Sequence, residues 1–220
     1  MPLGCRPAPS TIERGIRIRS QDRVVDFAER KRTLREQAHA NRRGQERKDE
    51  LSSEIVARFR QLPEYQAANV VMFYVDVRTE VRTRHDLQAA LNSGKKIVVP
   101  WCLDGELELF HLERMDELEI GMYKILEPRS ELREVESKTV DVGELDLIMV
   151  PGVAFDRRGA RMGHGKGYYD KLLQHARRDA PLVALAFECQ LFAEIPTEDH
   201  DIFMDKILSE KETYQGRGRS

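Results

Sequence analysis

Four short, almost entirely apolar runs constrain the fold of this chain more than any other feature. The runs are rich in apolar side chains and lack the polar alternation of a strand that faces water on one side. Such runs predict strands buried on both faces, as in parallel sheets that helices cover from both sides. We therefore expect an α/β fold with three layers (αβα) and a mainly parallel, Rossmann-like sheet. The four runs are residues 69–75, 96–100, 145–151 and 182–187.

Segments with apolar residues at helical spacing surround these strands. The predicted helices are residues 22–44, 49–62, 84–93 and 168–178. A more exposed strand is expected at 107–112, after a turn at Asp104 and Gly105, and a short last strand at 206–209. Residues 113–144 are charged and weakly patterned, so we expect a loop there with little regular structure.

A chain of 220 residues suits one domain with tails. Residues 1–25 are predicted to be a disordered basic tail, because the first ten residues hold three prolines and show no periodicity. Residues 26–212 then form a single α/β domain, and residues 213–220 a C-terminal tail. For the arginine-rich residues 1–20, a transit peptide is the alternative interpretation.

Membrane insertion and secretion are not indicated. No apolar run approaches the roughly 20 residues that span a membrane, and the first residues lack the apolar core of a secretory signal. The three cysteines are too few and too far apart for a disulfide framework or a zinc ribbon. We expect a cytoplasmic protein, with a monomer as the favoured state.

Charge is distributed unevenly along the chain. Residues 1–48 hold 13 basic and 6 acidic residues, a net charge of +7, whereas the whole chain has a net charge of −2. A basic N-terminal segment suits binding to phosphates, and nucleic-acid binding is one function that would use it. Aromatic residues do not alternate with its basic ones, since Phe27 is its single Phe, Tyr or Trp, so we regard nucleic acid as the less favoured partner.

The loop after the third predicted strand has the composition of a phosphate site. Gly163, Gly165 and Gly167 alternate, and a predicted helix follows directly. Glycines let backbone N–H groups approach an anion, and the helix N-terminus favours negative charge. Arg161 and Lys166 would add positive charge. The spacing fits neither a P-loop nor a dinucleotide fingerprint, and a surface loop with positive φ angles explains the glycines equally well.

Three carboxylate positions are candidates for ligand binding. Asp170 lies in the first turn of the helix after the glycine loop, where it suits Mg²⁺ bound to phosphate oxygens, or simply the helix dipole. The acidic segment 198–205 offers a second carboxylate, although in isolation a charged surface loop is the simpler explanation. Glu80 follows the first predicted strand, at the sheet edge where ligands collect; a pre-helix acid is the alternative.

Residues 151–170, with Gly163-His-Gly-Lys-Gly-Tyr-Tyr-Asp170, resemble the signature loop of the 5-formyltetrahydrofolate cyclo-ligase family, also called methenyltetrahydrofolate synthetases. Weaker matches stand in the family's order across residues 28–212, among them Lys31-Arg-Thr-Leu-Arg35 and the turn from Glu80 to Thr83. The resemblance implies conversion of 5-formyltetrahydrofolate to 5,10-methenyltetrahydrofolate with ATP and Mg²⁺. The formyl oxygen would attack the γ-phosphate, and N10 would then close the ring as phosphate leaves.

The resemblance also implies roles for individual residues. Lys166 and Arg161 would act in catalysis, and Asp170 and Asp201 would bind Mg²⁺, with Asp205 as a nearby substitute. The residues implied in folate binding are Val75, Glu80, His164 and Tyr168. Those implied in ATP binding are Lys31, Arg35, Arg161, Gly163, His164, Gly165, Lys166, Gly167, Tyr168 and Tyr169.

Two positions depart from the family pattern. Arg82 stands where the family usually has an acid, and Trp101 stands after Pro100, where an arginine is frequent. Both lie near the ends of predicted strands on the folate side. An alternative is therefore a divergent ATP-binding relative that kept the phosphate site and changed its acceptor.

Overall fold

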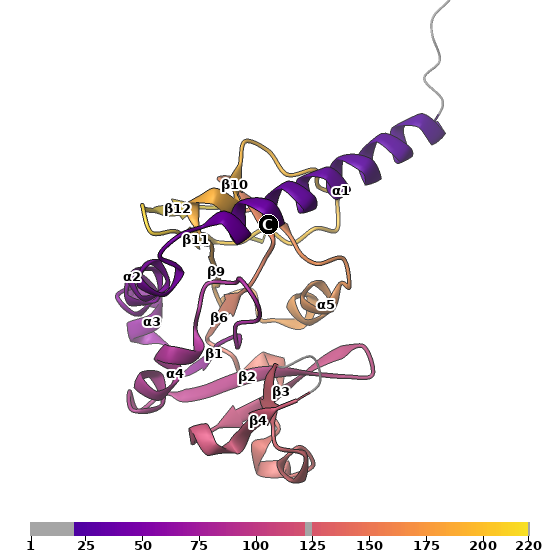
Figure 1. Ribbon diagram of the computed structural model, residues 1–220. Helices are drawn as coiled ribbons and strands as arrows, with labels where there is room; N and C mark the ends of the chain where they lie inside the picture. Colours follow the sequence, from indigo (N-terminus) through magenta and orange to yellow (C-terminus); the bar gives the residue numbers. More distant parts are fainter. Residues whose placement is uncertain (1–19, 122–124, 220) are drawn as a thin grey trace, which may run out of the picture.

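A seven-stranded sheet with helices on both faces forms the centre of the computed structural model, which describes residues 20–121 and 125–219 (Figure 1). The strand order is β12-β11-β9-β6-β1-β2-β3. The inner five strands are parallel, and the two edge strands are antiparallel to their neighbours. The strands are β1 Val70–Met72, β2 Lys96–Leu103, β3 Glu106–Leu112, β6 Leu147–Val150, β9 Leu182–Leu185, β11 Lys206–Leu208 and β12 Thr213–Gln215.

The apolar runs form strands because both of their faces are buried. Along β6, Leu147 and Met149 face one hydrophobic core, whereas Ile148 and Val150 face a second core on the other side of the sheet. All four side chains are completely buried. Successive residues of a strand point to opposite faces, so a strand between two cores needs an apolar residue at every position.

Helices cover both cores. On one face lie α2 Lys48–Arg60, α3 Pro63–Ala67 and α4 Arg84–Leu91, and on the other lies α5 Tyr168–His175 (Figure 1). The three-layer αβα fold is therefore confirmed. The helix predicted over 168–178 ends earlier, at His175, because Ala176 adopts an extended backbone.

The β2–β3 hairpin also follows from local sequence. Asp104 and Gly105 both have positive φ angles, of 48° and 85°. Two such residues form the tight turn whose twist suits paired antiparallel strands. The strands extend to this turn on both sides, so β2 and β3 are longer than the apolar runs alone indicate.

The first helix, α1 Ser20–Gly44, packs with its C-terminal half and projects beyond the domain with its N-terminal half (Figure 1). The packed half covers a second sheet with the strand order β10-β7-β8 and shares a small core with it through Ala38. The helix begins at Ser20, inside the tail expected over residues 1–25; residues 1–19 lie outside the described part. The strands of the second sheet are β7 Ala154–Asp156, β8 Arg161–Met162 and β10 Leu191–Phe192.

Residues 113–144 contain more structure than their charged sequence indicates. β4 Leu118–Ile120 and β5 Leu126–Pro128 pair antiparallel. The ammonium group of Lys138 is nearly buried between Glu113 and Glu117, at 2.6 Å from each carboxylate. Ion pairs thus stabilise this segment in place of apolar contacts. The sequence therefore lacks the apolar periodicity from which regular structure is predicted. Short 3-10 turns make up much of the rest: η1 Met115–Glu117, η3 Ser130–Leu132, η4 Glu136–Lys138 and η5 Val142–Glu144; a further turn, η6 Glu188–Gln190, follows β9.

The C-terminus differs from the tail expected over residues 213–220. Thr213–Gln215 forms β12, and the Tyr214 hydroxyl donates to Glu188 at 2.8 Å. Three residues are too short for a readable pattern, and their pairing depends on the edge of β11.

Within the two described ranges, no helix combines the length and the apolar character that crossing a membrane requires.

Candidate functional site

A cavity of about 330 Å³ opens at the carboxyl ends of the parallel strands. In chain order the five parallel strands have the arrangement 2-1-3-4-5, which reverses direction between β1 and β6. Ligands of doubly wound sheets bind at such a reversal. Val77 and Glu80, from the loop after β1, and Pro151 and Gly152, from the turn after β6, line the cavity here.

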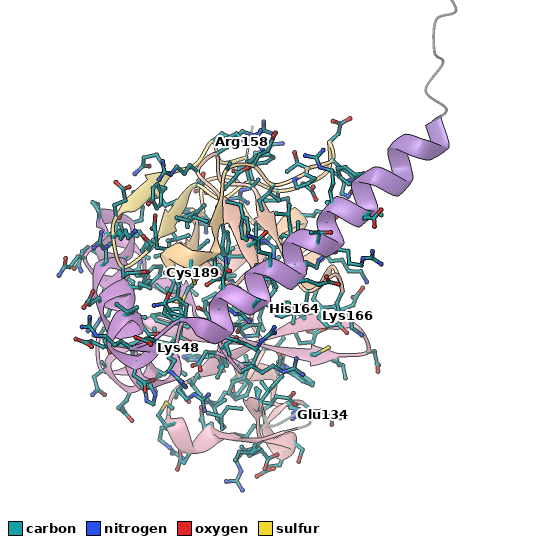
Figure 2. All side chains as sticks on the ribbon, turned by 45° about the horizontal axis from the view of Figure 1, so that its top comes forward. Lys48, Glu134, Arg158, His164, Lys166 and Cys189 are labelled. Carbon is teal, nitrogen blue, oxygen red and sulfur yellow. The ribbon has the colours of Figure 1, made fainter. Side chains whose placement is uncertain are left out.

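The glycine loop forms one wall of the cavity. Gly165 and Gly167 have φ angles of 91° and 72°, and Gly167 immediately precedes α5. The loop packs against α1, and Figure 2 shows His164 of the loop beside this helix. The Nε of Arg35 donates to the Gly163 carbonyl at 3.1 Å, and the rings of His39 and His164 stack at 5.3 Å. The predicted loop and helix start are therefore both present, with residues 161–170 all lining the cavity.

Cationic side chains gather around this loop. The Arg161 side chain is only 4 % exposed and pairs with Asp170, and its Nε has no hydrogen-bond partner among the described residues. Lys166 lines the cavity and makes no ion pair with any described residue. An under-satisfied buried guanidinium and a lysine beside exposed backbone N–H groups suit a phosphate chain.

α1 contributes two further cations to the same cavity, Lys31 and Arg35. The Nζ of Lys31 lies 3.3 Å from Glu198 and 3.6 Å from Asp201, so the acidic segment after residue 197 meets the basic helix. The structure thus brings together at one cavity the phosphate-binding residues expected from the sequence, although they come from α1 and from a loop 130 residues away.

Both carboxylates expected to bind Mg²⁺, Asp170 and Asp201, line the cavity. The side chains of Asp170 and Asp201 are 43 % and 22 % exposed there. Asp205 does not line it: its Oδ2 accepts a hydrogen bond from the Leu182 backbone at 2.7 Å, which ties β9 to the segment before β11. The described residues hold no cluster of three or more metal-binding side chains. One or two carboxylates completed by phosphate oxygens and water fit Mg²⁺.

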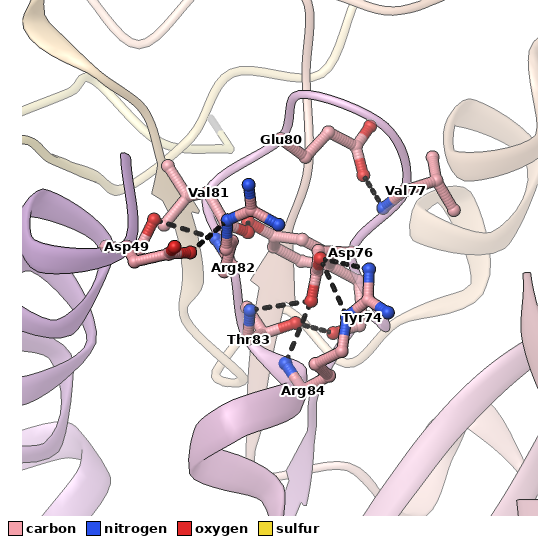
Figure 3. Close-up of polar contacts among 10 residues, drawn as sticks. Asp49, Tyr74, Asp76, Val77, Glu80, Val81, Arg82, Thr83 and Arg84 are labelled. Carbon is pink, nitrogen blue, oxygen red and sulfur yellow. Dashed lines mark hydrogen bonds and ion pairs between the residues drawn. The ribbon is translucent and has the colours of Figure 1, made fainter. Parts of the chain in front are cut away.

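The folate side of the expected site is formed by the loop after β1. Glu80 is only 7 % exposed, and one of its carboxylate oxygens accepts from the Val77 backbone at 3.1 Å (Figure 3). The other oxygen lies 3.5 Å from the Nε2 of His164, on the glycine loop. Val75 is buried in the core, and Val77, two residues later, lines the cavity instead.

Tyr168 and Tyr169 begin α5 at the edge of the cavity. Burial raises the pKa of the Tyr169 hydroxyl, and the nearby charge of Glu80 raises it further. Tyr169 therefore stays a neutral hydrogen-bond donor at physiological pH.

The two departures from the family pattern have different positions. Arg82 does not line the cavity and pairs with Asp49 of α2 (Figure 3). Trp101 lines the cavity. Only the second departure therefore bears on the acceptor.

Sequence reasoning missed one buried residue, Arg42. Its guanidinium, 1 % exposed, donates to the Thr79 hydroxyl at 2.9 Å and to the Gly152 carbonyl at 3.1 Å. It thereby joins α1 to both loops at the strand reversal. The signal was present in the sequence. Arg35 and Arg42 follow Lys31 by 4 and 11 positions, and these spacings place the three side chains on one face of a helix.

This chain is similar to known proteins over most of its length. The 5-formyltetrahydrofolate cyclo-ligase family model matches residues 27–210. The mouse 5-formyltetrahydrofolate cyclo-ligase is 30% identical over 156 residues, which cover 67% of this chain and 76% of the mouse protein. The solved structure of Aquifex aeolicus 5,10-methenyltetrahydrofolate synthetase is 32% identical, with a TM-score of 0.74, and the match covers 86% of this chain and 95% of that one. The chain belongs to the 5-formyltetrahydrofolate cyclo-ligase family.

Proposed function

We propose that this cavity is the active site in which the chain converts 5-formyltetrahydrofolate to 5,10-methenyltetrahydrofolate, with ATP becoming ADP and phosphate. The observation that carries the proposal is the 3.5 Å approach of His164, on the glycine loop, to Glu80. It brings the phosphate-binding loop and the carboxylate expected to bind the pterin to the same point. A phosphoryl transfer to the folate needs this proximity.

The reaction has two steps, and both depend on positioning. First, the formyl oxygen bonds to the γ-phosphorus of ATP while the bond from that phosphorus to ADP breaks. Then N10 bonds to the formyl carbon and loses its proton, and the carbon–oxygen bond breaks with departure of phosphate. Since negative charge moves between phosphate oxygens throughout, fixed cations and N–H donors supply most of the catalysis.

The residues of the cavity divide between the two substrates. The N–H groups of the glycine loop, with Lys31 and Arg35 from α1, bind the phosphates of ATP. Arg161 and Lys166 stabilise the charge on the transferred phosphoryl group. Glu80, held by the Val77 backbone, accepts hydrogen bonds from the pterin. The neutral Tyr169 hydroxyl adds a donor between the two substrates.

Asp170 and Asp201 would hold Mg²⁺. Bound there together with ATP, the ion would neutralise phosphate charge and fix the orientation of the phosphate chain. The present partners of these carboxylates, Arg161 and Lys31, are the cations that the phosphates would engage. Binding of ATP would therefore free both carboxylates to hold the ion.

A divergent acceptor is the second candidate, and Trp101 is the observation that favours it. Nucleic-acid binding has less support, because Lys31 and Arg35 face the cavity and Arg42 is buried, which removes three basic residues from the surface of α1. A monomeric, cytoplasmic protein remains our expectation from the sequence.

Absorbance in the methenyl-folate band tests the proposal directly. Enzyme is added to 5-formyltetrahydrofolate with ATP and Mg²⁺, with Asp170→Asn as the matched variant. A rise that requires ATP and Mg²⁺ and is lost in Asp170→Asn supports the proposal. ATP binding without any rise would exclude 5-formyltetrahydrofolate as the acceptor and favour the divergent one.

A further inference from the structure

The cavity has a second end whose chemistry differs from that of the glycine loop. At the carboxyl end of β2, Pro100, Trp101 and Cys102 line it, together with Leu107 of β3, Ile125 and Glu127. Most of these side chains are apolar, in contrast to the four cations at the other end. A ligand that fills the whole cavity must therefore be anionic at one end and planar or apolar at the other.

Trp101 is held rigidly at this end. Its side chain is 8 % exposed, and the guanidinium of Arg133 lies 4.6 Å from the centroid of the indole. The Nε of Arg133 donates to the Pro128 carbonyl at 2.8 Å, and a terminal nitrogen pairs with Glu127 at 3.2 Å. A guanidinium stacked on an indole face is attracted by the ring quadrupole, and its two other partners fix its position.

Strand order indicates which part of a folate meets this indole. Across the sheet, β6 leads to the glycine loop, β1 to Glu80 and β2 to Trp101. If the phosphates occupy the first position and the pterin the second, the p-aminobenzoyl ring, which follows the pterin in the folate molecule, reaches the third.

We propose that Trp101, held by Arg133, stacks on the p-aminobenzoyl ring of the bound folate and so determines specificity for substrates that carry this ring. This inference rests on the proposed function. Trp101 contacts the substrate away from the reacting atoms, and Arg133 acts through it as a positioning residue. Because the contact is the same before and after phosphoryl transfer, it contributes to KM and leaves kcat unchanged.

Fluorescence tests the contact without catalysis, since Trp101 is the one tryptophan of the chain. The probe is p-aminobenzoylglutamate, a fragment that absorbs too far to the blue to accept energy from tryptophan. We expect it to quench Trp101 emission to saturation, whereas ATP with Mg²⁺ does not. Calorimetry establishes the concentration of fragment that saturates the protein. Unchanged Trp101 emission at that concentration would overturn the proposal.

Substitutions test specificity. Trp101→Leu should weaken binding of p-aminobenzoylglutamate and raise the KM for 5-formyltetrahydrofolate by about 3- to 10-fold, from the usual strength of an aromatic pair. Trp101→Phe keeps a planar ring and should restore most of the affinity. Arg133→Met should raise KM less and alter the emission of free Trp101. Circular dichroism tests whether each variant is folded. If a variant does not fold, the fluorescence titration of the native chain still tests the proposal.

A reduced pterin that lacks the p-aminobenzoyl group is the matched ligand. Its affinity should be equal in the native chain and in Trp101→Leu; loss of pterin affinity in the variant would overturn the assignment of the ring. The two proposals fail separately. If Trp101→Leu has cyclo-ligase activity with an unchanged KM, the stacking proposal is wrong and the proposed function is supported. If the fragment quenches Trp101 emission but the native chain has no cyclo-ligase activity, the stacking proposal is supported and the proposed function is wrong.

Discussion

Arg161 and Asp170 form an ion pair across the glycine loop. Arg161 belongs to β8, just before the loop, and Asp170 belongs to the first turn of α5, just after it. The pair joins the two ends of a loop whose interior is mostly glycine. It also couples the guanidinium proposed to stabilise the transferred phosphoryl group to a carboxylate proposed to hold Mg²⁺.

Arg161→Met should reduce kcat by about a hundredfold or more, the usual effect of removing one donor to a developing negative charge. The freed Asp170 carboxylate should at the same time lower the Mg²⁺ concentration needed for half-maximal rate. Steady-state rates over a Mg²⁺ titration measure both effects. Arg157→Met, at an exposed arginine four positions earlier, is the control. A kcat within threefold of the native value in Arg161→Met would contradict the assigned role.

Lys31→Met should weaken ATP binding by about tenfold, equivalent to the loss of about 1.4 kcal/mol of charge-assisted contact. Lys31 lines the cavity, whereas the neighbouring Arg32 is 68% exposed and, among the described residues, pairs with Glu29 of its own helix alone. Arg32→Met should therefore leave the Kd for ATP unchanged. Calorimetric titration with ATP compares the two variants, and equal Kd values would show that α1 does not contact the phosphates.

Asp201→Asn and Asp205→Asn should separate a metal ligand from a structural carboxylate. Asp201 lines the cavity, so Asp201→Asn should raise the Mg²⁺ requirement about tenfold or more. Asp205 accepts from the Leu182 backbone, so Asp205→Asn should lower the free energy of unfolding by about 1–2 kcal/mol and keep the native Mg²⁺ requirement. Activity against Mg²⁺ concentration and urea unfolding measure these effects; the reverse pattern would assign the ion to Asp205.

Arg42→Met should destabilise the fold by about 1–3 kcal/mol, because it removes buried hydrogen bonds from a charged donor to Thr79 and Gly152. The Gly152 carbonyl keeps the bond from Gln190, which limits the loss. Arg43→Met is the control, since Arg43 is exposed on the same helix turn. The midpoint of urea unfolding measures both variants. Equal midpoints would mean that Arg42 contributes no net stability.

Stability should fall below neutral pH in part because of His39. Burial, and then the charges of Arg42, His164, Arg43 and Arg78, lower the pKa of His39 below its ordinary value of 6.5. The unfolded chain therefore binds this proton more readily. The free energy of unfolding rises with pH between the lowered pKa and 6.5 and is level above it.

His39→Gln should accordingly reduce the loss of stability between about pH 7.5 and about pH 5.5. Urea unfolding at the two pH values provides the comparison. His85→Gln, at an exposed histidine, should leave the difference as in the native chain. The interpretation is wrong if His39→Gln loses as much stability on acidification as the native protein does.

Local sequence determined the layers and the glycine loop. Apolar residues at every position of 147–151 require burial on both faces, and β6 lies between two cores. Alternating glycines permit positive φ angles, and Gly165 and Gly167 adopt them. These properties depend on side-chain period and backbone freedom, which each segment carries with it. The β4–β5 pair and β12 were missed because they are short and depend on partners elsewhere in the chain.

Only the tertiary structure decided which side chains meet at the cavity. Val77 lines it and Val75 does not, because the chain leaves the sheet after Met72 and the backbone turns before Glu80. Arg133 stacks on Trp101 from 32 positions away because the β4–β5 hairpin brings its segment over the end of β2. Such pairings depend on how separate elements pack, and local periodicity carries no information about them. The sequence by itself determined most strands of the central sheet and the main helices that cover it; packing at the strand reversal decided the site.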